Sequence, residues 1–116
     1  MDATRKERLQ AAGINVDGAL ERFMGNESML ERFLGRFLDE KSYAALAAAV
    51  AADDAAAAAA AVHTLKSVCG SLGCDRMQQL ALAQEAKMRA DDWPGAKAMM
   101  PELQEEYDRI CAALRG

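Results

Sequence analysis

The sequence predicts an all-α protein, an antiparallel up-down-up-down four-helix bundle with one or two short N-terminal helices. Its 116 residues are rich in strong helix formers and include only four Val, two Ile and two Thr. Apolar residues recur at spacings of three and four, which is typical of amphipathic helices. The predicted connections are short, and short connections favour antiparallel neighbours. The length fits a single domain over residues 1–116.

The first quarter of the chain predicts two short helices. Residues 2–12 form an amphipathic stretch that ends at Gly13, a residue type common just after a helix. Asn15 or Asp17 would cap the next helix, which would end near Gly25. The apolar residues in and beside this second helix exceed what its length needs for packing: Ile14, Val16, Leu20, Phe23 and Met24.

A long helix is predicted to start at Glu27 or Ser28 and to run to Ala52. The spacing of its apolar residues is typical of one buried stripe along a helix. That stripe comprises Leu30, Phe33, Leu34, Phe37, Leu38, Ala44, Ala45, Ala48 and Ala52.

The next two helices are predicted from the residues at their ends. Asp53 and Asp54 form an N-cap pair, because carboxylates are favourable at a helix N-terminus. The helix that follows carries His63 and should end at Gly73. Asp75 is expected to cap the following helix, which should fray near residues 91–92. Five of its residues lie on or near one face: Met77, Leu80, Ala81, Gln84 and Met88.

The last helix contains two prolines. Pro94 suits the first turn of a helix. Pro101 lies farther along, where proline inside a helix costs about 3 kcal/mol. The helix therefore either begins near Met100 or is kinked there. Its apolar seam comprises Ala96, Met100, Leu103, Tyr107, Ile110 and Leu114.

The composition excludes several classes of function. The net charge is −4 and the basic residues form no stripe, which argues against a nucleic-acid partner. No apolar run approaches the ~20 residues of a membrane span, and the start of the chain has no signal peptide, so we expect a cytoplasmic protein. Three cysteines without C-x-x-C spacing are expected to be buried thiols. With one histidine, the chain offers too few ligands for a metal site.

His63, the only histidine, lies on a polar helix face. On a helix, His63, Lys66, Ser67 and Gly70 fall at i, i+3, i+4 and i+7, which is one face. The centre of this face lies roughly 130° from the centre of the opposite apolar stripe. We therefore expect the imidazole to point toward solvent or a partner. The apolar stripe comprises Val62, Leu65, Cys69 and Leu72.

Small residues surround the histidine on the same face. Ala56, Ala59 and Ala60 leave the surface beside it low, which suits a docking surface. Alanine is also the residue type that forms helices best, so the run would equally serve as helix filler. The sequence leaves both interpretations open.

Residues 63–66, His-Thr-Leu-Lys, followed by Gly70 and Gly73, resemble the signature of histidine-containing phosphotransfer (HPt) domains. Members of that family show a His-x-Leu-Lys-Gly stretch followed by small residues. The resemblance extends over residues 13–115. Ser67 stands where the family has glycine, and a serine is still small enough to let a partner reach the imidazole.

The resemblance implies a phosphorelay intermediate that is neither a kinase nor an ATP-binding protein. His63 would carry the phosphoryl group, Lys66 would offset its charge and Ser67 would donate a hydrogen bond. A polar side chain of the next helix would bond the histidine, with Glu85 as first and Gln84 as second choice. No intrinsic cofactor is expected. Receiver domains of response regulators, which would supply Mg²⁺, and a hybrid sensor kinase are the expected partners of a monomer.

Two other classes of protein compete with this interpretation. A non-catalytic helical interaction module would bind a signalling partner without using the histidine. The dimerising hairpin of a sensor kinase would also present a helical histidine, although an acidic residue usually follows it there. Docking on the histidine face would use Ala59, Ala60, Glu85 and Gln84 together with the second helix, where Leu20, Phe23 and Met24 are the expected contacts.

Overall fold

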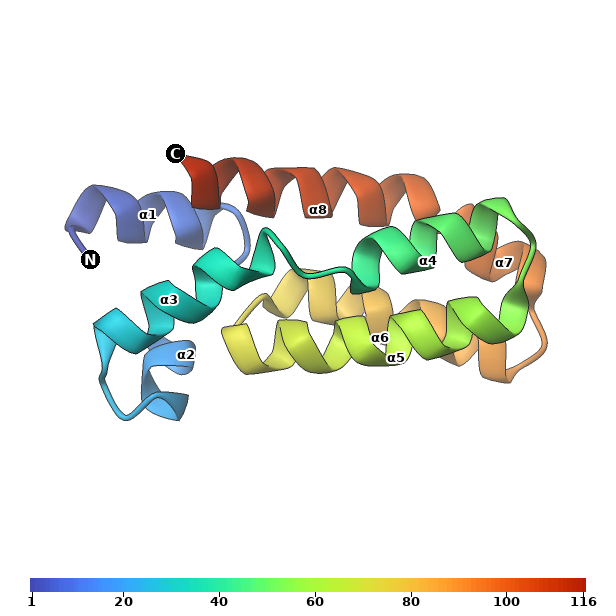
Figure 1. The fold of residues 1–116 in the computed structure, drawn as a ribbon, viewed down its shortest axis with the longest axis horizontal. Coiled ribbons are helices and arrows are strands. Elements are labelled where there is room, and N and C mark those ends of the chain that lie inside the picture. The colour runs from blue at the N-terminus through green and yellow to red at the C-terminus, as the bar shows by residue number, and fades with distance from the viewer.

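The computed structural model describes residues 1–116 and contains eight helices without a strand. The molecule is elongated, with principal extents of 43 × 24 × 20 Å (Figure 1). The helices are α1 (Ala3–Ala11), α2 (Val16–Arg22), α3 (Glu27–Phe37), α4 (Ser42–Ala51), α5 (Ala55–Leu72), α6 (Asp75–Arg89), α7 (Trp93–Ala98) and α8 (Met100–Arg115).

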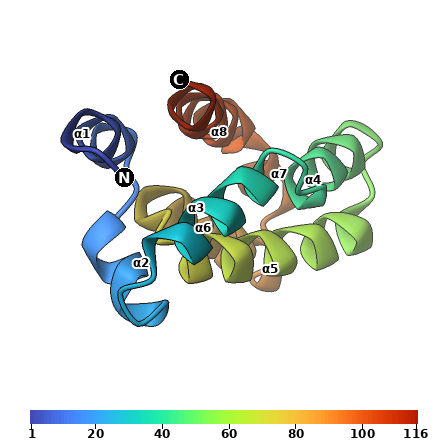
Figure 2. The ribbon, with the colours of Figure 1, turned by 60° about the vertical axis from the view of Figure 1, so that its left-hand side comes forward.

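The main body is the predicted up-down-up-down bundle. The α3–α4 segment runs in one direction, α5 returns, α6 reverses again and α8 runs back after the short α7 (Figure 1). The view in Figure 2 shows α1 and α2 at one end, beside α3 and the C-terminus of α8. The chain therefore encloses its own core, in contrast to the open two-helix hairpin of a sensor kinase.

One core connects seven of the eight helices. It contains 25 buried apolar residues, and the large ones include Phe37 on α3, Leu65 on α5, Met77 on α6 and Ile110 on α8. Cys69, Cys74 and Cys111 are buried free thiols, as expected from the sequence. No helix is both long and apolar enough to cross a lipid bilayer.

The predicted long helix over residues 27–52 is wrong, because residues 38–41 separate α3 from α4. The last turn of α3 is tightened by i→i−3 bonds, such as that from the Glu40 amide to the Phe37 carbonyl at 3.1 Å. The Glu40 carboxylate then accepts from the Ser42 amide at 2.7 Å, at the start of α4. The break resets the helical phase, so α4 buries Tyr43, Leu46 and Ala49. The predicted stripe residues that are exposed instead are Ala44, Ala45, Ala48 and Ala52.

The helix ends follow the predicted capping residues closely, with two errors. Asn15 and Asp54 each accept a backbone hydrogen bond from the first turn of their helices, at 3.0 and 3.1 Å. Asp53 does not cap; it bonds Trp93 and Lys97. Asp75 is not the cap of α6 either, because the turn ends one residue earlier and Cys74 occupies that position without a side-chain bond.

The two prolines both lie in first turns. Pro94 is in the first turn of α7, and Pro101 is in the first turn of α8, which begins at Met100. The missing amide hydrogen of proline costs nothing there, because the first amides of a helix have no partner within it. The helix therefore begins near Met100, which is the first of the two alternatives left by the sequence.

The turn between α5 and α6 depends on Gly73. Its φ is 76°, a left-handed conformation that favours glycine. Its carbonyl accepts from the Asn15 amide at 2.6 Å, and a bridge between Ile14 and Cys74 continues this contact. A side chain on Gly73 would place its Cβ 2.6 Å from the Asn15 carbonyl oxygen. This turn therefore joins the α1–α2 segment to the α5–α6 hairpin.

We predict that Gly73→Ala destabilises the protein by about 2 kcal/mol, because alanine pays for the left-handed conformation and also collides with Asn15. Gly35→Ala is the matched control. Gly35 lies within α3 with open space around its Cα, so alanine there should stabilise the protein by about 0.5 kcal/mol. Urea unfolding of both variants measures the difference. Equal effects at the two sites would contradict the role given to Gly73.

Candidate functional site

Helix α5 presents His63 to solvent. The residues it buries against the core lie on the opposite side: Ala58, Ala61, Val62, Leu65, Cys69 and Leu72. The His63 side chain is 63% exposed, as the sequence pattern predicts. The apolar stripe of α5 fixes the helix, and the helix fixes the position of the imidazole.

Glu85 on α6 joins His63 to Lys66. Its Oε2 lies 3.0 Å from His63 Nδ1, and its Oε1 accepts from Lys66 Nζ at 2.7 Å. The Glu85 side chain is 7% exposed, so this carboxylate bridges the two helices in a nearly buried position. The hydrogen bond from Lys66 lowers the pKa of Glu85 below its usual range, although burial acts in the opposite direction. His63 and Arg89 lower this pKa further. The sequence named Glu85 as the first choice for this contact.

The Glu85 contact determines which imidazole nitrogen is free. A carboxylate accepts hydrogen bonds, so the proton of a neutral ring is assigned to Nδ1 and the lone pair to Nε2. Nε2 has no hydrogen-bond partner within the chain. Glu85 therefore fixes the orientation of the imidazole, and the lone pair of Nε2 is free to act as a nucleophile.

A shallow depression of about 500 Å³ lies beside the imidazole. Its walls are formed by α5 and α6, and its lining residues are Ala59, Ala60, His63, Glu85, Met88 and Arg89. Ala59 and Ala60 form the low α5 side of this depression. Lys66 does not line this depression, whereas Arg89, which the sequence did not single out as a site residue, does.

Two further residues predicted for the histidine face, Ser67 and Gly70, have structural roles within the protein. The Ser67 hydroxyl donates to the His63 carbonyl at 3.2 Å, a bond to the preceding helical turn. A Cβ on Gly70 would lie 2.4 Å from Nε2 of Gln78 on α6. Gly70 thus makes room for a side chain of the neighbouring helix.

Gln84 is not a site residue, which corrects its prediction as the reserve partner of His63 and as a docking contact. It is fully buried and donates to the Ala96 carbonyl at 3.0 Å. The reason is helical phase: one residue is about 100° around the helix from Glu85, which directs Gln84 toward α7 and Met100 of α8.

The apolar residues near α2 divide between the core and the surface. Ile14 and Val16 are buried in the core. Leu20 and Phe23 are partly buried against it, and Met24 is 94% exposed. The Phe23 ring packs on an exposed aromatic, Phe33 of α3, with ring centroids 5.3 Å apart. Phe33 was predicted to be part of the buried stripe, but α3 buries Leu30, Leu34 and Phe37 and leaves Phe33 at the surface.

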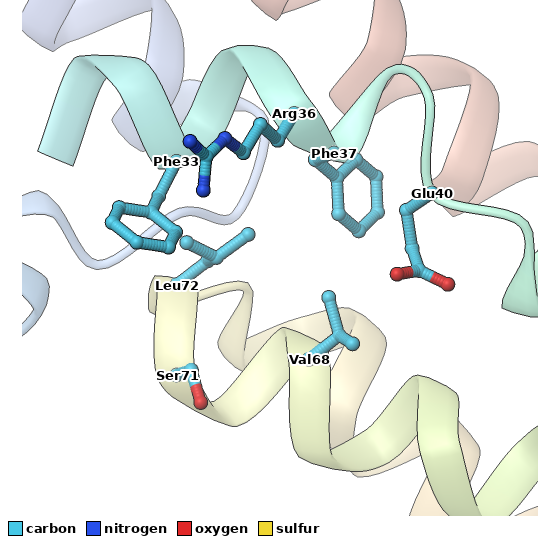
Figure 3. Close-up of a pocket in the computed structure, with 7 residues that line it drawn as sticks. All are labelled: Phe33, Arg36, Phe37, Glu40, Val68, Ser71 and Leu72. Carbon is cyan, nitrogen blue, oxygen red and sulfur yellow. The ribbon is translucent and has the colours of Figure 1, made fainter.

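A second pocket continues this apolar surface toward α5. Its volume is about 310 Å³, and Figure 3 shows side chains of α3 and α5 facing one another across it. The lining residues are Phe33, Arg36, Phe37, Glu40, Val68, Ser71 and Leu72. Val68 lies five residues after His63, about 7.5 Å along the helix axis. The pocket therefore lies farther along the same helix, with Val68 about 140° around the helix axis from His63.

Sequence comparison places the chain in a family. The Hpt domain family matches residues 28–113, from the start of α3 to the end of α8, and leaves α1 and α2 outside the match. The chain therefore belongs to the Hpt domain family, whose members serve in histidine phosphotransfer in phosphorelays. No curated protein and no solved structure matches the chain closely enough to count as a relative. No group of three or more His, Cys, Asp or Glu side chains is arranged to hold a metal ion.

We predict that Lys66→Met raises the pKa of Glu85, because the Lys66 hydrogen bond is the main cause of its lowering. A carboxyl whose folded pKa is depressed stabilises the fold above its unfolded pKa of about 4.3 and loses this contribution as pH falls through the folded value. The variant should therefore lose less stability than the wild type on acidification. Carboxyl ¹³C NMR titration measures the pKa directly.

Lys97→Met is the control, because Lys97 is the main cause of the lowered pKa of Asp53. It should raise the pKa of Asp53 and leave that of Glu85 unchanged. A Glu85 titration that is the same in the wild type and in Lys66→Met would contradict the bridging role of the carboxylate.

Proposed function

We propose that this protein is a phosphorelay intermediate in which His63 accepts a phosphoryl group from an aspartyl phosphate of a receiver domain and returns it to another. One observation carries the proposal: a solvent-exposed imidazole whose Nδ1 is held by a nearly buried carboxylate while Nε2 has no partner. Response-regulator receivers and a hybrid sensor kinase are the proposed partners. We propose that the protein acts as a monomer.

The transfer needs no base from this protein. The Nε2 lone pair attacks phosphorus in line, the Nε2–P bond forms, and the P–O bond to the receiver aspartate breaks. The aspartate leaves as a carboxylate with the electron pair. The ring keeps its Nδ1 proton and takes up positive charge, which Glu85 Oε2 stabilises at 3.0 Å. The reverse step returns the phosphoryl group to a second aspartate.

Lys66 and Ser67 have supporting roles in this proposal. Lys66 is 20% exposed and bonded to Glu85, so in the unphosphorylated protein it holds the carboxylate in place. Its charge also lowers the cost of bringing a phosphoryl group to the site. Ser67 retains the small size required one turn from the imidazole while its hydroxyl bonds the His63 carbonyl. The Mg²⁺ for the reaction is proposed to arrive with the receiver.

The receiver is proposed to dock on both sides of His63. On one side lie Ala59 and Ala60; on the other lies the apolar surface around Phe33 and the pocket of Figure 3. Leu20, Phe23 and Met24 extend that surface across α2. An apolar centre with a charged rim is the usual anatomy of a protein interface, and Arg36 and Glu40 supply the charges here.

The first test measures phosphoryl transfer from a radiolabelled, acyl-phosphate-charged receiver domain to this protein. We expect an acid-labile, base-stable label on the wild type and none on His63→Gln. His63 is exposed and outside the core, so the variant should fold like the wild type, which circular dichroism checks. Absence of label from several receivers, with His63→Gln binding partners equally well, would instead favour a non-catalytic interaction module.

We predict that Met24→Asn and Phe33→Ala each weaken receiver binding about five- to ten-fold, because truncating an apolar anchor of an interface costs about 1 kcal/mol or more. Met24 is exposed and asparagine tolerates its positive φ, so Met24→Asn should fold like the wild type; Phe33→Ala also removes the contact with Phe23, so circular dichroism checks its fold. Glu102→Ala on α8 is the control. Titration calorimetry measures the affinities. Unchanged affinity in both variants would remove this apolar surface from the interface.

A further inference from the structure

We infer that Arg89 binds the phosphoryl group when it is on His63, an inference that rests on the proposed function. Arg89 is the cation that lines the depression beside the imidazole. Its Nη2 lies 3.5 Å from Glu85 Oε1, and His63 Nδ1 lies 3.0 Å from the other oxygen of the same carboxylate. Arg89 and His63 therefore lie on the two oxygens of the same Glu85 carboxylate.

Lys66 is already engaged in the unphosphorylated protein. Its ammonium donates to Glu85 at 2.7 Å, its side chain is 20% exposed, and it does not line the depression. Arg89 is 71% exposed and lies beyond hydrogen-bond distance of Glu85. The guanidinium is therefore the cation that can turn toward an incoming phosphoryl group without giving up a short hydrogen bond.

The charges of the site favour a second cation beside Lys66 once a phosphoryl group is attached to His63. With a neutral imidazole, Lys66 and Glu85 cancel, so Arg89 gives the cluster its positive charge. A phosphoryl group brings about two negative charges. A guanidinium can donate two parallel hydrogen bonds to phosphoryl oxygens, which a lysine ammonium cannot do.

The position of Arg89 also has an ordinary structural explanation, which the test must separate. Arg89 is the last residue of α6, where a cation stabilises the helix C-terminus. Lys87 lies in the same final turn but does not line the depression. It offers a matched control, because Lys87→Gln removes the same charge from the same helix end.

During transfer, Arg89 would contact only the phosphoryl oxygens. The Nε2–P bond forms, the bond between phosphorus and the receiver aspartate breaks, and the aspartate carboxylate takes the electron pair. No proton moves to or from Arg89, which stays charged throughout. It lowers the barrier by offsetting charge on the equatorial oxygens.

The test compares rates of phosphoryl transfer from a charged receiver to wild type, Arg89→Gln, Arg89→Lys and Lys87→Gln. We expect Arg89→Gln to slow transfer about ten-fold, the effect of losing one hydrogen bond to a charged group at an exposed site. Arg89→Lys should recover part of the rate, and Lys87→Gln should match the wild type. A ³¹P NMR titration of the phosphorylated proteins should show a higher phosphoryl midpoint in Arg89→Gln.

The outcomes separate this inference from the proposed function. If the wild type and Arg89→Gln accept the phosphoryl group at the same rate, and their phosphoryl groups titrate at the same pH, the role of Arg89 is overturned. His63 would remain the acceptor in that case. Equal slowing by Arg89→Gln and Lys87→Gln would show a general helix-end charge effect and also overturn it. No transfer to the wild type would contradict the proposed function itself.

Discussion

The site depends on one carboxylate held between two helices. Glu85 projects from α6 and meets His63 and Lys66 of α5 at 3.0 and 2.7 Å. These contacts orient the imidazole, assign its proton to Nδ1 and leave Nε2 open to solvent. The carboxylate is nearly buried, and its charge is offset by Lys66 of α5 and Arg89 of α6. Any change in the packing of α5 on α6 would change the geometry around the nucleophile.

The α5–α6 hairpin is held by features far from the histidine. Gly73 makes the turn in a conformation that other residues adopt only with strain, and Cys74 continues it by donating to the Cys69 carbonyl at 2.9 Å. The Gly73 carbonyl also anchors Asn15, which ties α1 and α2 to the same turn. Small alanines on α5 beside His63 leave the surface low. The bundle thereby supplies a rigid helix with an accessible histidine.

Much of this structure could be predicted from the sequence, because it depends on local rules. Helical periodicity placed the His63 face away from the core, and caps such as Asn15, Asp54 and Gly73 set the helix ends. Glu85 could be named because the resemblance to HPt domains pointed to the next helix. The break at residues 38–41 escaped prediction, since no Gly or Pro marks it and Glu40 acts through a bond to the Ser42 amide.

The remaining errors depend on tertiary packing. Gln84 and Glu85 are neighbours in sequence, and only the packing of α7 and α8 against α6 shows that Gln84 is buried. Phe33 lies beside the buried residues of α3, and it contacts Phe23 and lines the pocket of Figure 3 instead of entering the core. Arg89 is an ordinary arginine at a helix end in the sequence. Its significance follows from the depression that it shares with His63.

The position of phosphorus on the imidazole tests the central claim most directly. ¹⁵N–³¹P correlation NMR of the phosphorylated protein distinguishes the two ring nitrogens. With Nδ1 bonded to Glu85, the account predicts phosphorus on Nε2 of His63 and a proton retained on Nδ1. Phosphorus on Nδ1, or on a side chain other than His63, would contradict it.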